Sequence, residues 1–115
     1  MNKQRICIVG DGLSGLMTAA VLSKVPGLEV NLIAKKRSKN LDKRTTAISD
    51  SNFKFIKHNI ISLSDRLFWP SKKIELFYET YNERIRFLNL YETNSNLMYV
   101  FENDKVKSFL LKEII

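Results

Sequence analysis

The sequence contains few of the residues that build disulfide-stapled, metal-bound or triad-based proteins. Its 115 residues include one cysteine, one histidine, two prolines and four glycines. A single cysteine, Cys7, excludes an internal disulfide. Together with one histidine, His58, it cannot complete a metal cluster or a nucleophilic triad. We expect Cys7 to be buried in an apolar strand and His58 to lie on the surface of a helix.

Long apolar runs are absent as well. The first apolar run, residues 6–9, ends at a glycine and is too short for the core of a signal peptide. No segment approaches the roughly 18–20 apolar residues that a membrane-spanning helix needs. We therefore expect a cytoplasmic protein, with peripheral association to the inner membrane as the alternative location.

The charge balance is basic, with 19 Lys and Arg residues against 12 Asp and Glu residues and a formal net charge of +7. Most basic residues are scattered, apart from a concentration in residues 35–44, and no basic stretch alternates with stacking aromatics. Nucleic-acid binding is therefore not expected. The hydrophobic fraction of 44% is ordinary for a globular protein, and the length fits one domain or a piece of a larger one.

The first third of the chain has the pattern of a strand, a helix and a second strand. Residues 5–9 form a continuous apolar run that predicts a buried strand, and residues 14–24 show helical spacing that ends at Pro26 and Gly27. Residues 28–34 predict the second strand. This order implies a right-handed crossover between parallel strands, which is a Rossmann-type βαβ unit in an α/β fold.

The remainder alternates short helices and strands. Residues 35–46 predict a polar loop, and residues 50–58 predict a helix with Phe53 and Ile56 facing inward and Phe55 as a further inward candidate. Trp69 and Pro70 interrupt the pattern. The last elements expected are a strand pair at residues 74–81 and 85–91, a strand at 97–101 and a helix at 103–115.

Three glycines follow the first strand at the spacing Gly10-x-Gly12-x-x-Gly15. Gly10 permits a tight turn, Gly12 lets a pyrophosphate approach the backbone, and Gly15 lets the helix pack close to the strand. Leu13 and Ser14 complete the loop, where the free N–H groups of a helix N-terminus attract phosphate. The motif predicts a dinucleotide site, and an accidental glycine-rich turn is the alternative.

The end of the second strand departs from this motif. A dinucleotide-binding unit places an acidic residue there, about 20 positions after the loop, to bind the ribose hydroxyls. The corresponding residues are Ala34, Lys35, Lys36 and Arg37. The basic residues indicate either a preference for the 2′-phosphate of NADP or weakened binding of an adenine dinucleotide. The spacing alone does not separate the two.

The chain resembles the FAD-dependent aromatic-ring hydroxylases, specifically the ubiquinone-biosynthesis branch, at residues 42–56, which read DKRTTAISDSNFKFI. In that family a glycine motif is followed by a D-x-R-x-x-A-[LI]-S stretch and a short helix. Residues 70–79 resemble the family's first strand toward the substrate domain. Residues 97–114 are similar to its V-E-N-x-x-L-x-x-x-L segment at the start of a helix. These landmarks occur in family order and cover nearly the whole chain.

The resemblance implies that the glycine loop holds the ADP half of FAD, and that NAD(P)H, the reductant, has no Rossmann domain of its own. Arg44 would approach the flavin side of the cofactor, where a guanidinium pairs with phosphate or hydroxyl oxygens. Asn103 and Lys107 occupy positions of polar cofactor contacts in the family. The implied reaction is a monooxygenation, in which reduced FAD activates O₂ for hydroxylation of an aromatic ubiquinone precursor.

The resemblance also implies an incomplete domain, because the family has a second FAD motif, similar to G-D-A-A-H, and most of its substrate sheet downstream. The implied division is an FAD-binding unit at residues 1–69, the first substrate-domain strands at 70–101 and a helix returning to the FAD domain at 102–115. The chain alone is expected to be inactive. Its expected partners are a second chain with the missing half and a ubiquinone-biosynthesis complex. The alternative is a non-enzymatic Rossmann-like interaction module or remnant.

Overall fold

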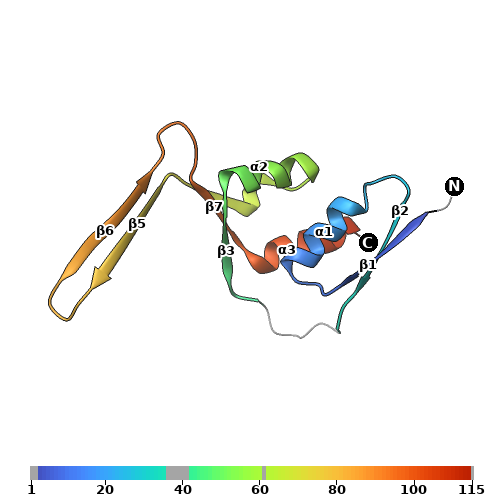
Figure 1. Ribbon diagram of the computed structural model, residues 1–115, viewed down its shortest axis with the longest axis horizontal. Helices are drawn as coiled ribbons and strands as arrows, with labels where there is room; N and C mark the ends of the chain where they lie inside the picture. The colour runs from blue at the N-terminus through green and yellow to red at the C-terminus, as the bar shows by residue number, and fades with distance from the viewer. Residues whose placement is uncertain (1–2, 36–41, 61, 115) are drawn as a thin grey trace.

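The computed structural model describes residues 3–35, 42–60 and 62–114. Within these ranges helices and strands occur in mixed order, as the sequence predicts (Figure 1). The strands are β1 (Gln4–Val9), β2 (Leu28–Ile33), β3 (Thr45–Ser49), β4 (Phe68–Ser71), β5 (Lys73–Glu79), β6 (Arg84–Tyr91) and β7 (Met98–Glu102). The helices are α1 (Leu13–Leu22), α2 (Asp50–Asn59) and α3 (Asn103–Ile114), with a 3₁₀ turn at Asp65–Leu67. None of the described helices is long and apolar enough to cross a membrane.

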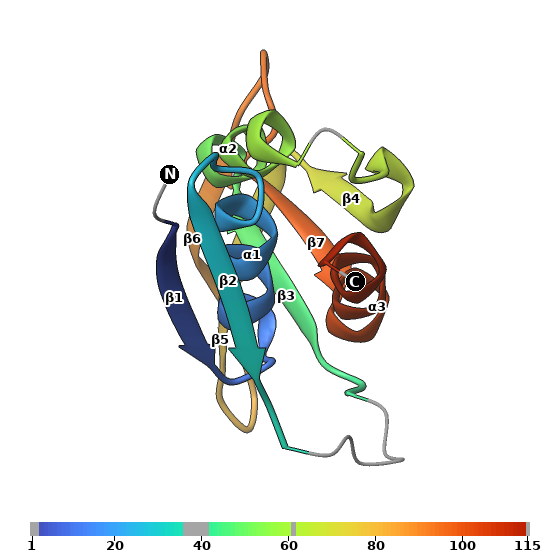
Figure 2. The same ribbon diagram turned by 90° about the vertical axis from the view of Figure 1, so that its right-hand side faces the viewer.

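The strands β1 and β2 pair in parallel, and α1 connects them and packs against one face of the pair (Figure 2). Successive side chains of a strand point to opposite faces, so Ile6 and Leu32 are half-buried beneath α1. Cys7 lies on the other face and is exposed, so the expectation of a buried cysteine was wrong. The physical reason is that no other described element covers this face.

A second sheet has the antiparallel order β3-β7-β4. Thr45 and Thr46 belong to β3, so the prediction that the polar loop extends to residue 46 was wrong at its end. Trp69 and Pro70 lie inside β4 rather than interrupting the structure. The sheet tolerates this proline because β4 is an edge strand that pairs with β7 alone, and a proline at an edge removes no central hydrogen bond.

The strands β5 and β6 form an antiparallel hairpin with a register shift at Leu76 and Phe77, which confirms the predicted strand pair. The hairpin projects from the helices as a long arm (Figure 1). The radius of gyration is 18.2 Å. A compact domain of this length has a radius of about 13 Å, so the arm extends well beyond the packed part of the molecule.

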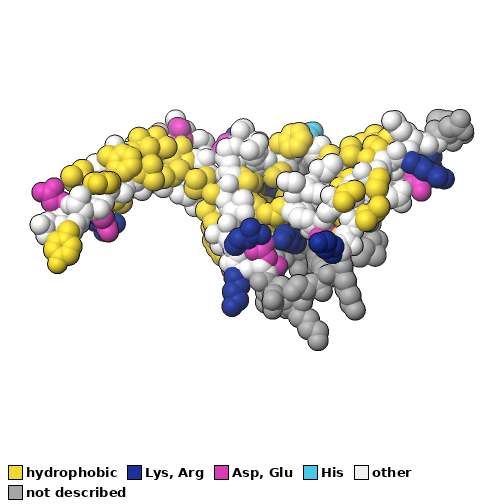
Figure 3. Space-filling view, turned by 60° about the horizontal axis from the view of Figure 1, so that its bottom comes forward, with side chains coloured by type: hydrophobic (Ala, Val, Ile, Leu, Met, Phe, Trp, Pro, Cys, Tyr) yellow, Lys and Arg dark blue, Asp and Glu magenta, His cyan; other side chains and the backbone are white. Residues whose placement is uncertain are grey.

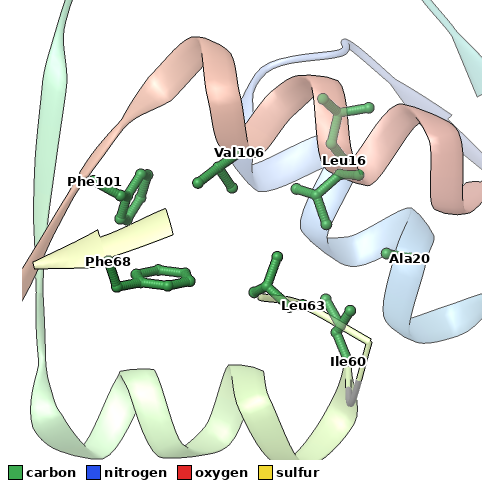
Figure 4. Close-up of a cluster of buried hydrophobic side chains, with 8 residues drawn as sticks. Leu16, Ala20, Ile60, Leu63, Phe68, Phe101 and Val106 are labelled. Carbon is green, nitrogen blue, oxygen red and sulfur yellow. The ribbon is translucent and has the colours of Figure 1, made fainter. Parts of the chain in front are cut away.

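The hydrophobic core joins α1 and α3 to the second sheet and to the segment after α2 (Figure 4). Its buried members are Leu16, Ala20, Ile60, Leu63, Phe68, Phe101, Val106 and Leu110. On α2, Phe53 and Ile56 pack against this core as predicted, and Phe53 stacks on Tyr99 with ring centroids 3.7 Å apart. Phe55 is 62% exposed because it lies on the outer side of α2, so its inward placement was wrong.

Candidate functional site

The glycine loop connects β1 to α1. Gly10 has a φ of +111°, a backbone conformation that glycine adopts without strain and that other residues rarely adopt. Its N–H donates a hydrogen bond of 2.7 Å to the carbonyl oxygen of Ile33 at the end of β2. The turn therefore starts at the carboxyl edge of the parallel pair, which is the edge where ligands bind in open α/β sheets.

Gly15 closes the loop from the helix side. A Cβ atom at this position would lie 2.2 Å from the carbonyl oxygen of Gly10, and no real Cβ approaches a backbone atom so closely. The first turn of α1 can pack on the end of β1 only when residue 15 has no side chain. Packing therefore explains Gly15, because any side chain at this position forces α1 to shift away from β1.

Gly12, in contrast to Gly15, has open space where a side chain would lie. It is the N-cap residue of α1, in an extended conformation with φ −70°, and a Cβ built on it meets no atom within 4 Å. The carbonyl oxygen of Gly12 accepts from the N–H of Leu16 at 2.9 Å. The N–H groups of Leu13, Ser14 and Gly15 have no acceptor among the described residues. Such unpaired donors, at the positive end of the helix dipole, favour an anion.

The end of β2 carries no acidic side chain. Ala34 and Lys35 are both exposed. The neighbouring Lys36 and Arg37 lie outside the described residues. A dinucleotide at the glycine loop would therefore find the ammonium group of Lys35 near the strand end, where the usual motif supplies a carboxylate.

A second polar group of residues, here called the Asp42 cluster, contains Asp42, Arg44, Thr46, Asn103 and Lys107. The Arg44 guanidinium binds the Asp42 carboxylate through both oxygens, at 2.8 Å from Nε and 3.0 Å from Nη2. The Lys107 ammonium donates to Oδ2 of the same carboxylate at 2.8 Å. Two cations from different parts of the chain therefore share one carboxylate.

Asn103 is the most buried residue of the Asp42 cluster. The residue is 4% exposed, and its backbone N–H donates to the carbonyl oxygen of Arg44 at 3.1 Å. Its Oδ1 accepts from the Thr46 hydroxyl at 2.6 Å, and its Nδ2 donates weakly to Asp42 at 3.4 Å. A buried amide costs free energy unless its donors and acceptors are satisfied, so these contacts fix α3 against β3.

The electrostatics of the cluster keep it charged. The Arg44 hydrogen bond, followed by that of Lys107, holds the pKa of the Asp42 carboxyl well below its usual range, and Asp42 in turn raises the pKa of Arg44. The side chain of Arg44 is 78% exposed, whereas that of Asp42 is 13% exposed. The Arg44 guanidinium is therefore exposed to solvent, while its two hydrogen bonds to the less exposed Asp42 carboxylate hold it in position.

The structure thus brings together three predicted site residues: Arg44, Asn103 and Lys107. Sequence reasoning missed Asp42 as their shared partner, although it begins the D-x-R stretch that carries the family resemblance. Spacing alone does not reveal it, because Asp42 and Lys107 lie 65 positions apart in the chain. Whether these residues bind a cofactor stays a prediction.

An open pocket of about 690 Å³ lies beside the Asp42 cluster. Its lining is Asp42, Lys43, Arg44, Thr45, Leu67, Glu102, Asp104, Lys105, Ser108, Phe109 and Lys112. Acidic and basic side chains are mixed there, and Lys105 pairs with Glu102 at 2.9 Å. The glycine loop contributes nothing to this lining, so the pocket and the loop are separate features.

No family model matches the chain, and a search of characterised proteins gives no match. In residues 3–35, 42–60 and 62–114, no three His, Cys, Asp or Glu side chains are arranged to hold a metal ion. Support for a ligand therefore comes from the local geometry of the glycine loop and of the Asp42 cluster.

Proposed function

We propose that residues 10–15 bind the pyrophosphate of FAD, and that the chain is the N-terminal, FAD-binding portion of a flavin-dependent monooxygenase. The substrate class is an aromatic ubiquinone precursor, with NAD(P)H as reductant and O₂ as oxidant. The chain alone is inactive. A second chain with the downstream half completes the enzyme, and the expected setting is a ubiquinone-biosynthesis complex at the inner membrane or in the cytoplasm.

The contrast between Gly12 and Gly15 is the observation that carries this proposal. Packing explains Gly15, because a Cβ there would meet Gly10, but nothing in the described structure explains Gly12. At an N-cap position, Ser, Asp or Asn stabilises a helix better than glycine does. A glycine with open space above it, beside three N–H groups that have no acceptor among the described residues, suits the close approach of a pyrophosphate.

The residues fit the pyrophosphate end of FAD better than its ribose end. The N–H groups of Leu13, Ser14 and Gly15 would hold the phosphate oxygens, and Arg44 would face the flavin side from the Asp42 cluster. Ala34 offers no acceptor for the ribose hydroxyls, so weak binding follows. When bound, FAD supplies the redox chemistry with O₂, while these residues bind and orient it.

The uncovered face of the parallel pair supports the incomplete-domain part of the proposal. On this face Val9 is 81% exposed and Ile33 is 55% exposed. Parallel strands are normally covered on both faces, and a pair of strands is fewer than a stable sheet contains. We infer that further strands and helices, from the second chain, complete the Rossmann-type unit. The division at residues 69 and 101 stays a prediction.

The test is titration of the purified chain into FAD, with quenching of flavin fluorescence as the readout. We expect a dissociation constant on the order of 10–100 µM, and loss of binding in Gly12→Val, which fills the space above residue 12, where a Cβ atom meets no protein atom within 4 Å. Ser23→Val places the same side chain at the other end of α1 and should bind as the wild type does. Circular dichroism checks that both variants are folded.

Equal FAD binding by the wild type and Gly12→Val would contradict the proposal. Tighter binding of NADP⁺ than of FAD, lost in Lys35→Ala, would favour an NADP site instead. A folded chain that binds neither would favour the interaction-module alternative, to which the exposed apolar surface of the β5–β6 arm also points.

A further inference from the structure

The pocket beside the Asp42 cluster extends along one side of α3. Five of its lining residues belong to this helix: Asp104, Lys105, Ser108, Phe109 and Lys112. Residues three and four positions apart lie on the same face of a helix, so these five follow one side of α3 for about two turns, or about 12 Å. The volume of about 690 Å³ is typical of a site for a small molecule.

The remaining lining residues are 42–45, Leu67 and Glu102. The carbonyl oxygen of Arg44 accepts from the backbone N–H of Asn103, and Thr45 pairs with Glu102, so the segment 42–45 runs beside the first turn of α3. Figure 3 shows basic side chains, with acidic ones between them, gathered over the part of the molecule that contains β3 and α3. Most of the charged groups therefore lie at the end of the pocket where α3 begins.

The three carboxylates of the lining are already compensated. Two cations bind Asp42, and Glu102 pairs with Lys105 at 2.9 Å. Asp104 lies in the first turn of α3, where the helix dipole favours an acidic side chain. Its Oδ2 is buried, so this oxygen does not face the open pocket. The carboxylates therefore leave the other cations of the lining free to act on a ligand.

Two lysines of the lining have no acidic partner. Neither Lys43 nor Lys112 forms an ion pair in the described part of the chain. Lys112 lies in the last turn of α3, where the negative end of the helix dipole offsets its charge. Lys43 is next to Arg44, whose carbonyl oxygen binds the first residue of the helix, so it lies at the positive end of the dipole. Uncompensated positive charge is therefore concentrated at that end.

Beyond the charged end the pocket is apolar. Phe109 lies between Lys105 and Lys112 on α3, and Leu67 adds a second apolar side chain. Most of the pocket surface belongs to nonpolar atoms, because lysine stems also line it. Such a surface favours an apolar ligand. An extended chain of about eight to ten carbons spans about 12 Å, at C–C bonds of about 1.5 Å.

We propose that this pocket binds a monocarboxylate with a linear apolar chain, which is the chemistry of a medium-chain fatty acid. The carboxylate pairs with the ammonium group of Lys43, and the chain lies along α3 over Phe109 toward Lys112. A single negative charge fits this end better than a phosphate dianion, because three carboxylates share the lining and repel a second charge. The glycine loop contributes nothing to the lining, so the site is independent of FAD.

The experiment is a titration of octanoate into the ¹⁵N-labelled chain, without FAD, at neutral pH and about 0.15 M salt. Amide chemical shifts are the readout. Octan-1-ol supplies the same chain without the charge, and acetate supplies the charge without the chain. We expect saturable octanoate binding with a dissociation constant on the order of 1 mM or below. The largest shifts should be at Arg44, Ser108 and Phe109, and each control probe should bind about fivefold more weakly or worse.

Two charge reversals test the orientation of the ligand. Lys43→Glu should weaken octanoate binding about tenfold, because an attraction is lost and a repulsion is gained. Lys112→Glu makes the same change at the far end of the pocket, beyond the screening length of about 8 Å, and should change the affinity by less than about threefold. Both lysines are exposed, so circular dichroism like that of the wild type is expected for each variant.

Octanoate binding that Lys43→Glu weakens far more than Lys112→Glu supports the proposal. A folded chain without saturable shifts overturns it. Octan-1-ol that binds as tightly as octanoate also overturns it, because the carboxylate then contributes nothing. Equal weakening by both variants, or a larger loss in Lys112→Glu, contradicts the assigned role of Lys43. Shifts centred on the glycine loop or on the β5–β6 arm place the ligand elsewhere and reject the pocket.

Discussion

The packing of α1 on β1 predicts a large effect of one methyl group at residue 15. In Gly15→Ala the new Cβ would lie 2.2 Å from the carbonyl oxygen of Gly10 and 3.1 Å from its carbonyl carbon. A carbon and a carbonyl oxygen in contact stand about 3.3 Å apart, so α1 must move by about 1 Å. The obstacle is backbone and cannot rotate away. Because α1 contributes Leu16 and Ala20 to the core, the movement also disturbs core packing.

The expected net loss of unfolding free energy for Gly15→Ala is about 2 kcal/mol. Overpacking of this kind costs about 1–3 kcal/mol or more, and the better helix propensity of alanine offsets up to about 1 kcal/mol. Urea unfolding followed by circular dichroism measures this loss as a shift of the midpoint by about 1 M. Gly12→Ala is the control, since its Cβ meets nothing and only a weak capping cost, below about 1 kcal/mol, applies. Equal midpoints for the two variants would refute the assigned role of Gly15.

Two further predictions concern charge and exposure. The folded-state pKa of Asp42 lies below its ordinary value of 3.8, so its stabilisation is complete above that pH and is lost as the pH falls toward the lower value. The loss of unfolding free energy in Asp42→Asn should therefore be constant from about pH 8 to 5 and shrink below about pH 4; a difference that shrinks near neutrality would contradict the ion-pair assignment. Cys7 should react with a thiol reagent within about tenfold of the rate of the urea-unfolded chain, because its side chain is exposed in the native sheet; strong protection in the folded monomer would show that the outer face of β1 is covered.

Local patterns predicted most of the elements. The apolar run before Gly10, the helical spacing of α1 and the two strand-like segments on either side of residues 82–83 each depend on neighbours in sequence, and the structure has all three. The strand β3 was missed because its pairing with β7 is remote, with Thr45 opposite Glu102. The strand β4 was missed because Pro70 normally ends a strand, and only the edge position in the sheet permits it.

The same distinction, between features set by neighbours in sequence and features set by remote contacts, applies to the candidate site. The glycine spacing predicted the loop, since the motif reports backbone geometry within six residues. The spacing could not show that packing leaves no room for a side chain at Gly15 but leaves Gly12 open, because that contrast depends on how α1 packs on β1. The role of Asp42 was equally hidden, since Arg44 and Lys107 meet only after α3 docks beside β3. Cys7 was misplaced because an apolar run does not reveal how many faces of a sheet are covered.

The most direct test of the dinucleotide site is to locate ADP on the chain by amide chemical shifts in ¹H–¹⁵N spectra. ADP contains the half of FAD that the glycine loop is proposed to bind, and the N–H groups of Leu13, Ser14 and Gly15 are unpaired within the described structure. Saturating ADP should shift these amides most, and Gly12→Val should abolish the shifts. Shifts centred instead on Lys43, Lys105 and Lys112 of the pocket, or no shifts in a folded chain, would contradict it.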